Sequence, residues 1–247
     1  EDQLRGEAAT LPFFSNGQFT NPMVLRIAGL GYQKGFGGHF HNDNSVAVLR
    51  DIPGVILAVP SNGADAARML RECVRLAREE QRVVVFLEPI ALYPMRDLHG
   101  DKDGLWMTRY PDPSERIVLG EVGVGGDGAD LAIVTFGNGV YLSHQALPQI
   151  KGAGIKARIV DTRWLSPLPQ AALTAAVQGC RNILIVDETR HSGGVAEALM
   201  AHFHEAAPGV PLARLTAEDS FIATGPAYAA TMPSSAGIVA AAKGLVR

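Results

Sequence analysis

Three short apolar runs in the first part of the chain predict buried strands. The runs are residues 22–28, 54–59 and 83–89. Between the last two, residues 61–81 carry apolar side chains at helical spacing, separated by arginines and glutamates, which predicts an amphipathic helix. Ser61 or Asn62 can cap this helix, and Asp65 is placed favourably in its first turn. Cys73 falls on the apolar face, which indicates a core side chain rather than a reactive thiol.

From residue 130 onward, apolar runs and helical patterns alternate four times. The apolar runs are residues 130–137, 155–161, 182–188 and 210–217, and the helical patterns are residues 141–154, 168–180, 193–207 and 234–246. The runs are continuously apolar, which is typical of strands buried on both faces. We therefore predict an α/β domain with a largely parallel sheet, covered by helices and connected by right-handed crossovers.

A polar stretch without periodicity separates these two parts. It is rich in Asp, Gly and Pro, which predicts an interdomain linker over residues 97–115. Trp106 and Tyr110 are expected to pin this linker to a surface. The predicted organisation is a first domain over residues 1–96, the linker, and a second domain over residues 116–247. The chain opens on the pattern of a helix interior, so we expect it to be a piece of a longer protein.

Composition and charge exclude several classes of function. Apolar residues make up 47% of the 247 residues and charged residues 19%, as in an ordinary globular protein. The 22 Lys and Arg residues are balanced by 25 Asp and Glu residues, and no basic stripe favours nucleic acid or an anionic membrane. No apolar run approaches the roughly 20 residues that span a bilayer. Two cysteines without disulfide or metal-site spacing favour a reducing, cytoplasmic compartment.

Two glycine-rich motifs are candidates for anion binding. Residues 120–130 precede a strand rather than a helix, so they lack the strand, turn and helix order of a dinucleotide site, and we interpret them as a hairpin turn. Residues 188–199 do lie between a strand and a helix, where backbone N–H groups can hold an anion. The alternative, which we favour, is that Ser192 caps the helix while the glycines permit close packing.

The stretch GFGGHFHNDNS, residues 35–45, carries the strongest candidate chemistry. His39 and His41 stand two residues apart, so in extended backbone both imidazoles face the same side. An H-x-H pair can supply two metal ligands, with Asp43 the only nearby acid of compatible parity, or the two side chains can have a structural role. We favour catalysis, because the glycines let a large ligand approach and imidazole titrates near neutral pH.

Several motifs, in the same order, resemble the β subunit of the thiamine-diphosphate-dependent decarboxylating component of 2-oxo acid dehydrogenase complexes. The segment HFHNDNS resembles the family's HYHSQS, IVDTRWLSPLP resembles IDLRTLSPLD, and IVDETRHSGGVAEAL resembles VHEAPRTGGFGAEI. The resemblance covers essentially the whole chain. It implies a transketolase-like fold, in which the end of a pyrimidine-binding domain is followed by the transketolase-type C-terminal domain.

The resemblance also implies roles for individual residues. His41 matches the family histidine that lies near the reactive thiazolium carbon, holds the 2-oxo acid carboxylate and assists acyl transfer. His39 matches the earlier histidine of the same motif, while Asn42, Asp43 and Asn44 replace the family's Ser-Gln-Ser. The acid that activates the cofactor lies upstream of this chain in the family, so no cofactor-binding residue is assigned. Magnesium and the diphosphate are held by the α subunit or a fused α-like region, so no metal ligand is assigned either.

The resulting expectation is part of an enzyme that decarboxylates a 2-oxo acid on thiamine diphosphate and transfers the acyl group to a lipoyl domain. The implied partners are an α subunit or α-like region, a dihydrolipoyl acyltransferase, and a second copy across a two-fold dimer interface. The fragment alone is expected to be inactive, and a eukaryotic version would lie in the mitochondrial matrix. Two alternatives stay open: a transketolase-like two-carbon transferase, and a non-catalytic module for assembly and acyltransferase docking.

Overall fold

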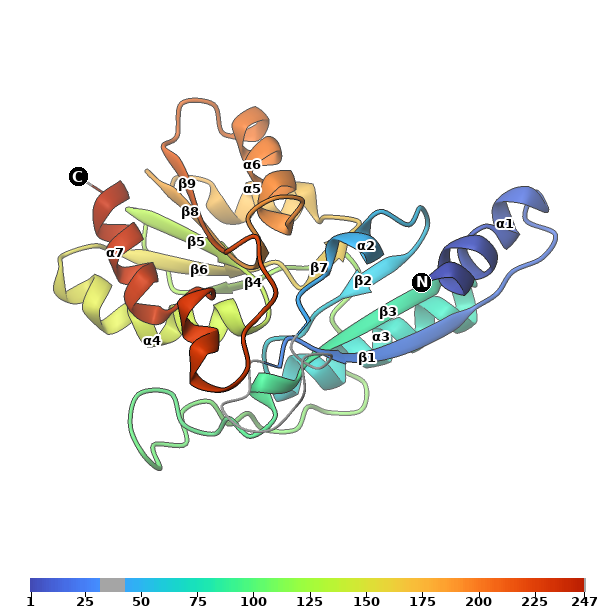
Figure 1. Ribbon diagram of the computed structural model, residues 1–247, viewed down its shortest axis with the longest axis horizontal. Coiled ribbons are helices and arrows are strands. Elements are labelled where there is room, and N and C mark those ends of the chain that lie inside the picture. Colours follow the sequence, from blue (N-terminus) through green and yellow to red (C-terminus); the bar gives the residue numbers. More distant parts are fainter. Residues whose placement is uncertain (32–42, 247) are drawn as a thin grey trace.

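The computed structural model describes residues 1–31 and 43–246, which form two sheets with helices packed on them (Figure 1). The first sheet has the strand order β1-β3-β2-β7, and the second has the order β4-β6-β5-β8-β9. This confirms the predicted α/β fold class with largely parallel sheets. No helix in the described part of the chain is long and apolar enough to cross a membrane.

The three strands predicted in the first part of the chain are confirmed as a parallel unit. They are β1 (Met23–Gly29), β2 (Ile56–Ala58) and β3 (Val83–Pro89). The predicted helix is α3 (Gly63–Glu80), which begins where Asn62 Oδ1 accepts the backbone N–H of Asp65 at 2.9 Å. Cys73 is fully buried between α3 and the sheet, and burial raises the pKa of its thiol to about 12, which confirms a core role.

The fourth strand of this sheet comes from the second half of the chain. β7 (Trp164–Ser166) pairs antiparallel with β2, and Trp164 is fully buried against Ile56, Ala58 and the apolar face of α3. Periodicity did not predict this strand. The second half therefore completes the core of the first sheet as well as forming its own.

The second sheet confirms the four predicted alternations of strand and helix. The pairs are β5 (Leu131–Thr135) with α4 (Asn138–Gly152), β6 (Ala157–Asp161) with α5 (Gln170–Val177), β8 (Ile183–Arg190) with α6 (Val195–Ala206), and β9 (Leu212–Ala217) with α7 (Ser235–Leu245). Leu131 and Ile133 pack against α4 and α7, whereas Ala132 and Val134 pack against α5 and α6. β5 is therefore covered on both faces, as its continuous apolar sequence predicts.

The glycine-rich stretch before β5 differs from its prediction. It contains a short edge strand, β4 (Gly123–Gly125), whose partner is β6 in antiparallel orientation rather than the adjacent β5. The predicted hairpin turn is therefore wrong. Gly128 allows the close approach that follows β4, because a Cβ atom there would lie 2.4 Å from the carbonyl carbon of Lys156.

Short elements complete the chain. They are the helical turns η1 (Leu4–Ala9), α1 (Leu11–Phe14), α2 (Ala47–Arg50), η2 (Ile90–Leu92) and η3 (Gly225–Ala230). Residues 97–115, predicted as a linker, contain no helix or strand. Trp106 packs edge-on against Tyr141 and His144 of α4, at 5.0 and 5.6 Å between ring centroids. Arg71 of α3 lies over the ring of Tyr110 at 5.4 Å, so both aromatic residues pin the linker as predicted.

Candidate functional site

The candidate site lies where β1 ends and the two sheets meet. The segment that carries His39 and His41, residues 32–42, is outside the described residues, and we call it the histidine segment. Both of its flanks are described. The backbone N–H of Leu30 donates to the carbonyl oxygen of Asp43 at 3.2 Å, so the two ends of the segment are held side by side.

A buried carboxylate from the second sheet supports these ends. Glu188 of β8 is only 2% exposed, and its oxygens accept the backbone N–H of Asn138 at 2.8 Å and the side-chain amide of Asn138 at 2.5 Å. The same amide donates to the carbonyl oxygen of Leu30 at 3.2 Å. Asn44 donates from its side chain to the main-chain carbonyl of Glu188 at 2.9 Å. The chain on each side of the histidine segment is thus fixed to the second sheet.

The local sequence explains why Asn138 and Glu188 meet. Asn138 is the first residue of α4, where backbone N–H groups lack intrahelical partners and favour a negative charge. Gly137, just before it, has a positive φ of 52°, and a Cβ atom there would lie 2.4 Å from Glu188 Oε1. Only glycine leaves room for the carboxylate at this turn.

A cavity of about 810 Å³ opens beside this network. Its walls come from Gly31 after β1, η2, the start of α4 and the segment around η3, and include Met95, Leu142 and Met232. Asn138 and Glu188 lie at its polar side. From β5 the chain crosses to β6 on one side, and from β8 it crosses to β9 on the other side. The cavity therefore lies at a topological switch point of the sheet, where α/β proteins commonly bind ligands.

Asp43, the acid considered as a third metal ligand, is engaged with its own chain. Its Oδ1 atom accepts the backbone N–H of Ser45 at 2.9 Å and the Ser45 hydroxyl at 2.6 Å, and it lies 4.0 Å from the guanidinium of Arg190. Within residues 1–31 and 43–246, no three His, Cys, Asp or Glu side chains are grouped so that they could hold a metal ion.

The glycine motif at residues 188–199 is built differently from its prediction. Ser192 binds Asp219 rather than capping α6, with its N–H and hydroxyl donating at 2.8 and 2.6 Å. The first N–H groups of the helix are instead taken by Thr189 Oγ1 and Asp187 Oδ2. The Ser192 cap is therefore wrong, and these N–H groups are not available to an anion. Close packing is confirmed, because a Cβ atom on Gly194 would lie 2.2 Å from a carbonyl oxygen.

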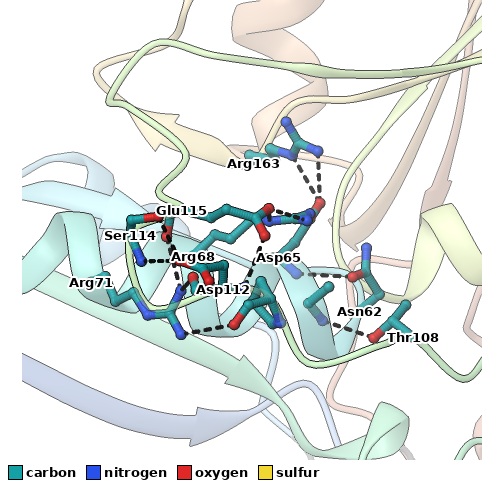
Figure 2. Close-up of polar contacts among 11 residues, drawn as sticks. Asn62, Asp65, Arg68, Arg71, Thr108, Asp112, Ser114, Glu115 and Arg163 are labelled. Carbon is teal, nitrogen blue, oxygen red and sulfur yellow. Dashed lines mark hydrogen bonds and ion pairs between the residues drawn. The ribbon is translucent and has the colours of Figure 1, made fainter.

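A second polar cluster joins the two halves of the chain. Arg163, which follows β6, donates to Asp65 Oδ2 of α3 at 2.7 and 3.1 Å (Figure 2). Beside it, the Ser61 hydroxyl donates to Asp161 Oδ2 at 2.5 Å. Thr108 of the linker accepts the backbone N–H of Ala64, so strand ends, helix and linker meet here. These contacts fix the first sheet relative to the second.

Burial of Asp161 predicts a pH-dependent stability. Burial raises the pKa of this carboxyl from 3.8 to about 6, although the Ser61 hydroxyl and the Arg163 charge oppose the rise. The pKa of Asp161 is higher in the folded protein than in the unfolded one. Its contribution to the free energy of unfolding is therefore fully present below the unfolded pKa and is lost as pH rises through the folded pKa. The shift corresponds to about 3 kcal/mol of unfolding free energy.

In Asp161→Asn, the free energy of unfolding is expected to depend less on pH between about pH 4 and pH 7, because residue 161 no longer titrates. Urea unfolding of the complete protein at several pH values measures it. Asp101→Asn, at an exposed linker position, serves as the matched control and should keep the wild-type slope. An unchanged slope in Asp161→Asn would show that this carboxyl does not titrate in the folded protein as described.

Comparison with known proteins shows which protein family and which curated proteins the chain resembles. The transketolase C-terminal domain family matches residues 120–238. The β subunit of the pyruvate dehydrogenase E1 component from Bacillus subtilis is 26% identical over 250 residues, which cover 98% of this chain and 70% of the relative. The 2-oxoisovalerate dehydrogenase β subunit from Pseudomonas aeruginosa is 31% identical over 211 residues, which cover 83% of this chain and 57% of the relative.

A solved structure agrees in fold. It is described as a split gene transketolase, an inactive β4 tetramer, with a TM-score of 0.66 and 21% identity, covering 91% of this chain and 66% of that chain. Residues 120–238 match a transketolase C-terminal domain, and the chain shares the fold of this transketolase. Its curated relatives are E1 β subunits of 2-oxo acid dehydrogenases, which is the family that its motifs resemble.

Sequence reasoning did not find the residues that hold the histidine segment. Asn44 was noted only as a departure from the family motif, and Asn138 and Glu188 were not singled out. A signal was present, because both of the latter are polar residues at the carboxyl ends of predicted buried strands. The positions and roles of His39 and His41 stay predictions.

Proposed function

We propose that this chain is the β-type part of a 2-oxo acid dehydrogenase E1 component. The complete enzyme decarboxylates a 2-oxo acid on thiamine diphosphate and transfers the acyl group to a lipoyl domain. The observation that carries the proposal is the alignment of nearly the whole chain with E1 β subunits, including the segment that bears His41. The anchoring of that segment beside a large cavity supports it.

The described residues fit one end of the cofactor. The cavity walls are mainly apolar, and no Lys, Arg or His occurs among its described lining residues, so nothing there would balance a diphosphate. An apolar ring could be accommodated. The diphosphate and magnesium would be held by an α subunit or an α-like region. When bound, thiamine diphosphate supplies the electron sink for decarboxylation.

The two histidines of this chain supply binding and proton transfer. The His41 imidazolium would pair with the carboxylate of the 2-oxo acid and orient it, because an opposite charge is needed where solvent is displaced. Imidazole can also act as a proton donor near neutral pH, which would serve acyl transfer. His39, two residues earlier, would lie on the same side in extended backbone and assist it.

Exposed apolar surface supports the proposed assembly with other chains. Phe13 and Phe14 near the N-terminus are 80% and 81% exposed, and Tyr93, Met107 and Tyr110 lie along a groove of about 630 Å³ beside the linker. Large exposed apolar side chains of this kind mark protein interfaces. We propose that an α subunit or α-like region, a second copy of this chain and a dihydrolipoyl acyltransferase contact the chain. Residues 1–247 alone should then show no turnover with added cofactor.

A substrate panel tests this function. The complete enzyme is assayed with thiamine diphosphate and, separately, with pyruvate, branched 2-oxo acids and a ketose phosphate with an aldose acceptor. We expect carbon dioxide release and acylation of a lipoyl domain with at least one 2-oxo acid, and no transfer from the ketose phosphate. Two-carbon transfer without decarboxylation of any 2-oxo acid would contradict the proposal and favour a transketolase-like activity.

A further inference from the structure

We propose that Glu188 and Asn138 are positioning residues for catalysis, which fix both ends of the histidine segment from the second sheet. The inference rests on the proposed function for its catalytic readout. It assigns the C-terminal α/β unit a part in the reaction, in addition to any part in assembly.

The first step of the argument is the cost of burying Glu188. A carboxylate that is 2% exposed loses nearly all of its hydration, and only directional hydrogen bonds offset that loss. Two of them come from the main chain and side chain of a single residue, Asn138. Apolar side chains would fill this position without the desolvation penalty of a carboxylate. The buried carboxylate is therefore explained better by the contacts that it orients than by a gain in stability.

The second step is where the contacts lead. Asn138 is 108 residues away from Leu30 in sequence and holds its carbonyl oxygen with the amide that also binds Glu188. Asn44 is 144 residues away from Glu188 and holds its main-chain carbonyl. Leu30 and Asn44 are both buried, and each is separated from the histidine segment by a single residue. Glu188 of β8 therefore supports both flanks of the histidine segment. Its side chain binds Asn138, which holds Leu30, and its main-chain carbonyl accepts the side-chain amide of Asn44.

The third step is that the amide of Asn138 has one orientation available. Glu188 offers only acceptors, so Asn138 must present Nδ2 to it, and the second hydrogen of Nδ2 reaches Leu30. A glutamine at position 188 can present its own N–H₂ group. In one case the Asn138 N–H₂ group would face the N–H₂ group of the glutamine, donor against donor. In the other case the Asn138 amide would rotate so that its oxygen faces the glutamine, and its N–H₂ group would no longer reach Leu30. Either outcome loosens the end of β1.

Glu188→Gln in the complete enzyme is therefore the main test, with Glu197→Gln as the matched control. Glu197 lies on α6 with a half-exposed side chain and touches no residue of this network by any described contact. We expect kcat for acyl transfer to fall about 10-fold to 100-fold in Glu188→Gln, because small displacements of a reacting group have effects of this size. KM for the 2-oxo acid should change less than kcat, and the control should match the wild type.

Hydrogen exchange gives a readout that does not need activity. The Leu30 amide, which donates to Asp43, should exchange at least about fivefold faster in Glu188→Gln than in the wild type. Exchange in α3, on the far side of the first sheet, should stay unchanged. If the enzyme proves to have another activity, this measurement still decides whether Glu188 anchors the segment.

A double variant separates positioning from stability. In Glu188→Gln with Asn138→Asp, the glutamine amide can donate to the new carboxylate, so the buried pair is complementary again. The carboxylate has no hydrogen for Leu30, which stays released. We expect the melting temperature to recover toward the wild type while kcat and Leu30 exchange do not. Recovery of kcat together with stability would overturn the inference, as would wild-type exchange at Leu30 in Glu188→Gln.

Discussion

Replacing His41 with alanine is expected to slow acyl transfer to a lipoyl domain by about 10²–10⁴-fold in the complete enzyme. The imidazole is proposed to orient the carboxylate of the 2-oxo acid and to supply a proton in the transfer step. Alanine can do neither. The rate of lipoyl acylation at saturating thiamine diphosphate measures the effect. Thermal unfolding of the same variant is measured alongside, so that a loss of rate can be separated from a loss of folding.

His204→Ala is the matched control, since His204 is exposed on α6 and away from the cavity lining. It should leave the rate unchanged. His39→Ala distinguishes the two candidates, and we expect a smaller effect than for His41→Ala. A nearly wild-type rate in His41→Ala would remove this residue from the mechanism.

Replacing Trp164 with alanine is expected to cost about 3–5 kcal/mol of unfolding free energy. Trp164 is fully buried and packs with Ile56, Ala58 and the apolar face of α3, although it belongs to the second half of the chain. Its removal leaves a cavity in the first sheet's core and weakens the attachment of β7. Urea unfolding, followed by circular dichroism, measures the loss.

Two variants make this result specific. Trp164→Phe should cost much less, because it keeps most of the volume and removes an indole N–H that is buried without a hydrogen-bond partner in the described structure. Trp106→Ala removes the other tryptophan, which is only partly buried on the linker, and should also cost less. A Trp164→Ala protein as stable as Trp106→Ala would contradict the packing described for β7.

Much of the fold follows from local pattern. The strands β5, β6, β8 and β9 lie in largely apolar runs, and each is followed by a helix whose apolar positions recur at helical spacing. The start of α3 is predictable from Asn62 and Asp65, because a side-chain cap acts within one turn. Such features depend on near neighbours in sequence, which a pattern can reveal.

Features that depend on distant partners were not predictable. β7 has three residues, too few to show a period, and its partner β2 lies about a hundred residues earlier. Ser192 was a plausible cap by type, but Asp187 reaches the helix start from within the preceding strand. The same holds for the candidate site. The His39 and His41 pattern is visible in sequence, whereas the Asn138 and Glu188 contacts exist only once the sheet has formed.

The most direct test of the account is a structure of the complete enzyme with thiamine diphosphate bound. We predict that the imidazole of residue 41 faces the thiazolium ring across a domain or subunit junction, with Asn138 still holding the end of β1. An imidazole enclosed in an apolar interior, remote from the cofactor and from any junction, would contradict the account.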